Sequence, residues 1–124
     1  MTLRRLELLQ WFGLVGAAPT WFAQLILGWG LAEAQCGPGG QHWAISNDLW
    51  QSLLMAWGLG ICLVAESAAL AVFRATSSAE EDTAPPEGRM HFFSTAALAA
   101  NLIFAMIVLL TGVAAISDAT CRQS

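Results

Sequence analysis

The sequence contains no lysine and no tyrosine among its 124 residues, and charged side chains of any kind are scarce. They make up 11% of the chain, against about 25% in an average soluble domain. The net charge is −4 and the arginines form no patch larger than Arg4 and Arg5, so we expect no nucleic-acid partner. Hydrophobic residues reach 56%, and six residues are tryptophan. This composition predicts a membrane protein.

Motifs for independent chemistry are also missing from the sequence. There is no Cys-x-x-Cys pair, no haem-attachment motif, no glycine-rich phosphate loop and no serine or cysteine triad. The two histidines, His42 and His91, are expected on opposite faces of the membrane, where they cannot share a haem or a metal. We therefore expect that this chain binds no cofactor or metal alone and is not an enzyme by itself. It can still be a subunit of an oxidoreductase complex.

Three apolar runs are each long enough for the roughly 20 residues that a membrane span requires. In lipid the backbone must satisfy its own hydrogen bonds, which helices do and open sheets do not. We predict an all-α membrane protein with a single three-helix transmembrane domain over residues 1–124. The predicted spans are about 11–32, 49–73 and 92–116, joined by loops at 33–48 and 74–91.

The first span has an alternative interpretation as a secretory signal. Arg4 and Arg5, the apolar run and Ala32-Glu33-Ala34 resemble a signal peptide with its cleavage site. The run is longer than the roughly 7–15 apolar residues of a signal core. We therefore predict that the segment is a retained helix.

Arginine positions predict the orientation of the three spans. Arg4 and Arg5 precede the first span, and Arg74 and Arg89 flank the second loop, whereas Arg122 is alone on the other side. The positive-inside rule places the N-terminus and the second loop in the cytoplasm. The first loop and the C-terminus then lie outside. We predict a multi-pass protein of the bacterial cytoplasmic membrane, with the C-terminus in the periplasm.

Two of the three cysteines are predicted to share the outer side of the membrane. Cys36 follows the first span and Cys121 follows the third, whereas Cys62 lies well inside the second. The bacterial periplasm is oxidising, so disulfides persist there. We predict a Cys36–Cys121 disulfide, with two free thiols or a metal site as the alternatives.

A few polar side chains fall inside the predicted spans. Glu66 and Asn101 lie at similar depth, and Gln24 is a third long polar residue in the apolar segments. A buried carboxyl is costly when charged and must pair or stay protonated. Three interpretations stay open for Glu66: a structural hydrogen bond, for which Asn101 is in reach, contact with a partner subunit, and proton transfer.

Two tryptophans and one proline stand out within the spans. Trp21 and Trp57 lie deep, where an indole needs a hydrogen-bond partner or a flat surface. Helix packing and contact with another subunit or a lipid are the alternatives for both. Pro19 removes a bond to the carbonyl of Val15 and predicts a kink in the first helix.

The start of the second span carries a capping signal. Asp48 followed by Gln51 resembles a capping box, and Ser46 and Asn47 are rival caps. Any of these residues satisfies a free backbone N–H group at the helix start. The sequence predicts that the helix begins here.

Residues 16–36, "GAAPTWFAQLILGWGLAEAQC", resemble the first helix of small three-helix membrane proteins encoded beside bacterial haem-copper cytochrome c oxidases. The family has a proline followed by an aromatic residue, a Gly-aromatic pair and a cysteine in this region, and a second cysteine near the C-terminus. The matching positions here are Pro19, Trp21, Gly28, Trp29, Cys36 and Cys121. This chain continues three residues beyond Cys121.

The resemblance implies a supernumerary subunit of a terminal oxidase or respiratory supercomplex that holds no redox centre of its own. Haem and copper are then expected in its partners, which are integral membrane subunits, and lipid covers the remaining surface. The alternative is a self-associating small transporter or channel component, in which Glu66 carries a proton or a cation.

Overall fold

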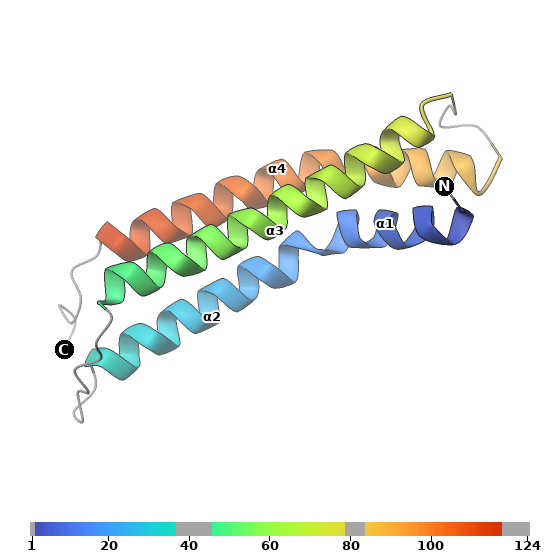
Figure 1. The fold of residues 1–124 in the computed structure, drawn as a ribbon. Coiled ribbons are helices and arrows are strands. Elements are labelled where there is room, and N and C mark those ends of the chain that lie inside the picture. Colours follow the sequence, from blue (N-terminus) through green and yellow to red (C-terminus); the bar gives the residue numbers. More distant parts are fainter. Residues whose placement is uncertain (1, 37–45, 79–83, 118–124) are drawn as a thin grey trace.

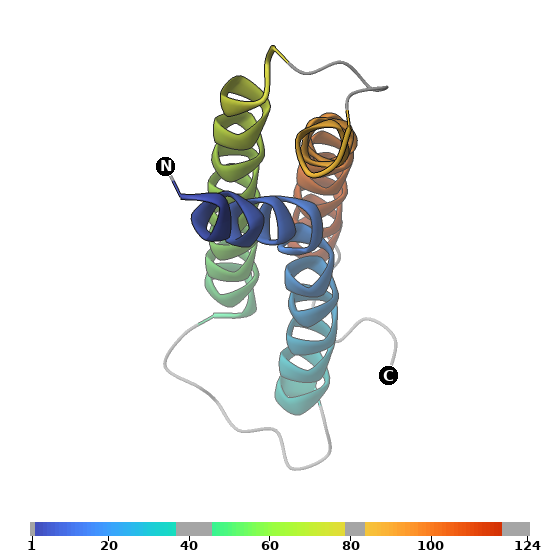
Figure 2. The ribbon, with the colours of Figure 1, turned by 90° about the vertical axis from the view of Figure 1, so that its right-hand side faces the viewer.

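The computed structural model describes residues 2–36, 46–78 and 84–117, and every regular element among them is a helix. The helices are α1 (Leu3–Val15), α2 (Ala17–Cys36), α3 (Asn47–Ala75) and α4 (Glu87–Ser117). Figure 1 shows α3 and α4 side by side along their length, with α1 and α2 following them as one bent arm. In Figure 2, α1 crosses from α3 to α4.

The number of spans agrees with the sequence prediction when α1 and α2 count as one. Helices α3 and α4 are each long and apolar enough to cross a membrane. The pair Leu3–Val15 and Ala17–Ala34 passes the same test together, although it bends by 41°. The all-helical class is confirmed for the described residues, and two or three spans are long and apolar enough to cross a membrane. The orientation of the termini stays a prediction.

The bend in the first span falls at Gly16, three residues before Pro19. Proline has no N–H to donate to the carbonyl four residues earlier, and its ring crowds that carbonyl. Here the carbonyl belongs to Val15, so the helix is interrupted directly after it. The Gly16 N–H still bonds the Phe12 carbonyl at 2.9 Å, and the Thr20 hydroxyl donates to the Gly16 carbonyl at 2.8 Å. The distortion is thus confined to one residue.

Small side chains fill the interior, whereas large apolar side chains point outward. The buried apolar residues are Ala17, Cys62, Ala65, Ala68, Ala69, Val72, Met90, Ala97 and Val108. Helix α1 comes so close to α3 that a Cβ on Gly13 would lie 3.0 Å from the Ala69 nitrogen. On α3, a Cβ on Gly58 would lie 2.9 Å from a methyl group of Val108. Small residues permit the close backbone approach that favours helix association in lipid.

The cap of α3 is Ser46, one of the rival caps. Its hydroxyl accepts a hydrogen bond from the Leu49 N–H at 3.3 Å. Gln51 does not complete a capping box, because its amide donates to the Gly28 carbonyl on α2 at 3.0 Å and to Asn47 Oδ1 at 3.4 Å. This contact ties the start of α3 to α2.

Candidate functional site

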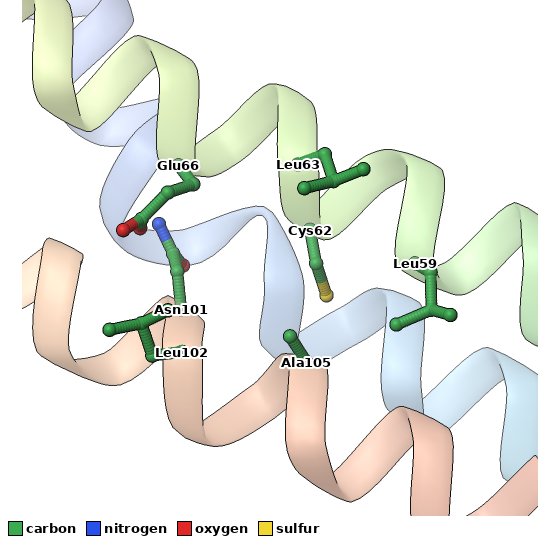
Figure 3. A pocket seen from close by; sticks show the side chains of 7 residues that line it. All are labelled: Leu59, Cys62, Leu63, Glu66, Asn101, Leu102 and Ala105. Carbon is green, nitrogen blue, oxygen red and sulfur yellow. The ribbon is translucent and has the colours of Figure 1, made fainter.

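A pocket of about 160 Å³ lies between α3 and α4, near the middle of both helices. It opens on the outer surface, because two of its lining residues, Leu63 and Leu102, are 68% and 61% exposed. Its wall is apolar, and Glu66 and Asn101 lie opposite each other on the two helices at one end (Figure 3). The lining residues are Leu59, Cys62, Leu63, Glu66, Asn101, Leu102 and Ala105.

Glu66 and Asn101 each carry a buried oxygen atom without a hydrogen-bond donor among the described residues. Asn101 is 1% exposed, and its amide nitrogen donates to the Gly13 carbonyl on α1 at 2.8 Å. Its Oδ1 and the Glu66 Oε2 are both buried and have no partner among the described residues. The structure therefore brings Glu66 and Asn101 together, but the amide of Asn101 bonds α1 and not the carboxyl. We call these two residues the Glu66 layer.

No cation approaches Glu66 within the part of the chain that the structure describes. The ion pair formed there joins Arg89 Nη2 to Glu7 Oε1 at 3.7 Å. Arg74 lies eight residues from Glu66 on the same helix, which is about 12 Å of rise. The chain contains no lysine. A counter-ion for this carboxyl would have to come from outside the described residues.

Gln24 and Trp21 connect α2 to α4 in a second polar layer. Gln24 is buried, and its amide nitrogen donates to the Val108 carbonyl at 3.4 Å. The Trp21 indole N–H donates to the Thr111 hydroxyl at 3.3 Å, and its ring packs on Phe104 with centroids 6.4 Å apart. We call Trp21, Gln24 and Thr111 the Gln24 layer. Its donors bond within the chain, as helix packing requires.

Both layers leave an acceptor unpaired, but their surroundings differ. Gln24 Oε1 has no partner among the described residues. It packs against Gly58, where an added Cβ would lie only 3.3 Å away. The free oxygens of the Glu66 layer belong instead to residues that border a pocket. These oxygens are themselves buried, as the Gln24 oxygen is.

Trp57 lies on the outside of α3 and is 44% exposed. Trp21, by contrast, is partly buried and bonded to α4. The sequence predicted the same alternatives for both tryptophans, because both lie deep in their spans. Trp57 is the more exposed of the two candidates for contact with a lipid or another subunit.

Two glutamines are buried that the sequence did not place in the interior: Gln10 was not singled out, and Gln51 was expected only to cap its helix. Gln10 is 2% exposed with an unpartnered Oε1, and Gln51 is 5% exposed and bonded to α2. Both lie at the edges of the predicted spans, where a polar residue is expected at the membrane surface. Only helix packing shows that Gln51 lies opposite Gly28, so the sequence carried no signal for this contact.

The cysteines are only partly described. Cys62 is a buried free thiol on the wall of the pocket. The side chain of Cys36 and all of Cys121 lie outside the described residues, so the predicted disulfide stays a prediction. Alkylation of the native protein, followed by a non-reducing gel, tests it directly.

His91 has a packing role at the end of the bundle. Its Nδ1 lies 3.2 Å from the Thr76 hydroxyl, and its ring stacks on Phe73 with centroids 4.9 Å apart. His42 lies outside the described residues. Among residues 2–36, 46–78 and 84–117, no group of three His, Cys, Asp or Glu side chains is placed to hold a metal ion.

Comparisons with known proteins add nothing to these observations. No family model, no curated protein and no solved structure matches the chain.

Proposed function

We propose that this chain is a non-catalytic accessory or assembly subunit of a respiratory membrane complex, in particular of a haem-copper cytochrome c oxidase or supercomplex. Haem and copper would belong to its partner subunits. The complex would lie in the bacterial cytoplasmic membrane, and this chain would cross that membrane several times. The specific link to an oxidase rests on the resemblance of residues 16–36 and the positions of Cys36 and Cys121.

The observation that carries the general role is the distribution of polar and apolar groups. The Gln24 layer, Gln51 and the Asn101 amide all donate to neighbouring helices of the same chain. The outside of α4 is covered with large apolar residues. Those more than 40% exposed are Phe92, Leu102, Ile103, Met106, Leu109, Leu110 and Val113. A surface of this kind suits contact with lipid and with other membrane helices.

Purification in a mild detergent tests this proposal. A tagged chain is expected to co-purify at a fixed ratio with oxidase subunits, identified by mass spectrometry, and with their haem absorbance. The reciprocal experiment, with the tag on the oxidase, must recover this chain at the same ratio. A stable assembly of this chain alone, free of haem proteins in both experiments, would contradict the proposal.

A second function, a small transporter or channel component, is favoured by one observation. The buried Oε2 of Glu66 has no partner among the described residues, and intramembrane carboxyls of this kind mark proton or ion paths. Proton or cation flux into liposomes containing only this chain would support it. Flux that persists unchanged in Glu66→Gln would exclude Glu66 as the carrying group.

A further inference from the structure

Four of the five arginines lie at one end of the bundle. Arg4 and Arg5 are in the first turn of α1, Arg74 is in the last turn of α3, and Arg89 is in the first turn of α4. Figure 1 shows these three helix ends at the same end of the molecule. Arg89 pairs with Glu7 at 3.7 Å. The other three are exposed and form no ion pair or hydrogen bond among the described residues, so their charges are available to an anion.

The outward side of α1 is apolar beyond Arg4 and Arg5. Leu8 follows these arginines by four and three residues, and the next members of the row are again three or four residues apart, so all lie along one side of the helix. The apolar members are more than 40% exposed: Leu8, Trp11, Phe12 and Val15. The buried residues of α1, Gln10 and Gly13, lie on its other side. We call Arg4, Arg5 and these four apolar residues the α1 stripe.

The length of the α1 stripe matches one leaflet of a membrane. From Arg5 to Val15 the helix rises about 15 Å, which is half of the roughly 30 Å hydrocarbon layer. Helices α1 and α2 together pass the test for a membrane span, and the arginines lie at the outer end of that span. The α1 stripe therefore presents two cations at the membrane surface and apolar side chains below them.

This order of groups fits a phospholipid with a negative headgroup. A guanidinium group donates two parallel N–H groups to phosphate oxygens, and basic residues beside a membrane span attract anionic lipids. A soluble phosphate would use the arginines but leave the apolar row of the α1 stripe uncovered. A zwitterionic lipid carries an ammonium group that the arginines repel.

We propose that the α1 stripe binds an anionic phospholipid, with the headgroup phosphate at Arg4 and Arg5 and an acyl chain along Leu8, Phe12 and Val15. The sequence contains a competing anion, the acidic segment Glu80-Glu81-Asp82, which lies outside the described residues. The site is formed by this chain alone. Its test therefore does not depend on the proposed role as an accessory subunit, and either proposal can fail without the other.

The first test compares two lipids that have the same acyl chains. The full chain is purified in a neutral detergent and titrated with phosphatidylglycerol or with phosphatidylcholine, and native mass spectrometry measures the bound fraction. We expect saturable binding of phosphatidylglycerol that is at least about fivefold tighter than that of phosphatidylcholine, the effect of one arginine near a membrane surface. Glycerol 1-phosphate, which has the phosphate without acyl chains, should not displace the lipid.

Single arginine variants locate the headgroup. Arg4→Gln and Arg5→Gln should each weaken phosphatidylglycerol binding about fivefold. Arg74→Gln is the matched control, because it removes the same charge from an exposed, unpaired arginine at the same end of the bundle but outside the α1 stripe. It should weaken binding far less. All three side chains are exposed, so the variants should fold.

The fluorescence of Trp11 locates the acyl chain. Phosphatidylglycerol with brominated acyl chains, at a low fraction in neutral nanodiscs, should quench this indole more than brominated phosphatidylcholine does at the same fraction. The signal of Trp11 is the difference between the unmodified chain and Trp11→Phe.

Four results would overturn the proposal. The first is equal affinity for the two lipids, and the second is an equal effect of Arg74→Gln and of the two α1 variants, which would show only general attraction to positive charge. The third is displacement of the lipid by glycerol 1-phosphate, which would show a site for any phosphate. The fourth is binding that appears only after Glu80, Glu81 and Asp82 are replaced by amides, because the arginines would then serve the acidic segment of this chain.

Discussion

The Gln24 layer and the Glu66 layer use similar residue types at different places in the bundle. In the Gln24 layer, the Gln24 amide and the Trp21 indole donate to α4, and the remaining oxygen is packed against Gly58. In the Glu66 layer, one amide bonds α1, but two oxygens remain free at residues bordering a pocket. The first layer bonds α2 to α4 through two donors, whereas the second bonds α4 to α1 through one donor and leaves two buried acceptors unpaired.

The largest loss of stability is expected when α1 is separated from α3, because the Glu66 layer is bonded to α1. Gly13→Leu places a side chain where a Cβ alone would lie 3.0 Å from the Ala69 backbone. Overpacking of this kind costs ~2–3 kcal/mol. Denaturant titration in mixed micelles should show that loss. Gly30→Leu is the matched control, because a Cβ there meets nothing within 4 Å; equal losses in both variants would show that α1 does not pack as described.

A smaller loss is expected when the donor of the Glu66 layer is removed. Asn101→Leu deletes the 2.8 Å bond to the Gly13 carbonyl and should lower the free energy of unfolding by about 1 kcal/mol. The same titration measures it. Ser67→Ala is the control, since that exposed hydroxyl bonds only its own helix, at Leu63. If the two variants lose the same stability, the Asn101 bond does not stabilise the bundle.

In the Gln24 layer, loss of a single indole donor should be measurable but modest. Trp21→Phe keeps the ring contact with Phe104 and removes the 3.3 Å bond to Thr111. Hydrogen bonds between membrane helices average about 0.6 kcal/mol, so a loss of that order is expected in thermal unfolding. Trp57→Phe, at an outward position, should change stability by less. If the two variants behave alike, the Trp21 bond contributes nothing.

The smallest effect on stability is expected at Glu66 itself. Its carboxyl makes no hydrogen bond or ion pair among the described residues, so Glu66→Gln should leave the free energy of unfolding within about 0.5 kcal/mol or raise it. Unfolding of the purified chain checks this. A loss well above 1 kcal/mol would show that Glu66 holds the bundle together, as the Gln24 layer does, and would erase the contrast between the layers.

The sequence predicted the features that depend only on position along the chain. Run length predicted the spans, and the rise per residue placed Glu66 and Asn101 at the same depth. It was insufficient for the direction in which each side chain points around its helix axis, which helix packing decides. That is why Asn101 bonds Gly13, and why Trp21 and Trp57 differ, although their depths are alike. The Asp48–Gln51 capping box was wrong for a similar reason: Ser46 caps the helix, and the Gln51 side chain turns toward α2 and donates to the Gly28 carbonyl.

The bend at Gly16 also changes how much bilayer the first span can cross. Helix α1 has 13 residues, about 20 Å of helix, and it turns 41° away from the direction of α2. Its reach along the α2 axis is therefore shorter by roughly 5 Å than that of a straight helix. Hydrophobic mismatch costs a fraction of a kcal/mol per Å. The bend therefore fits the first span to a thinner hydrocarbon layer than a straight helix of the same length would match.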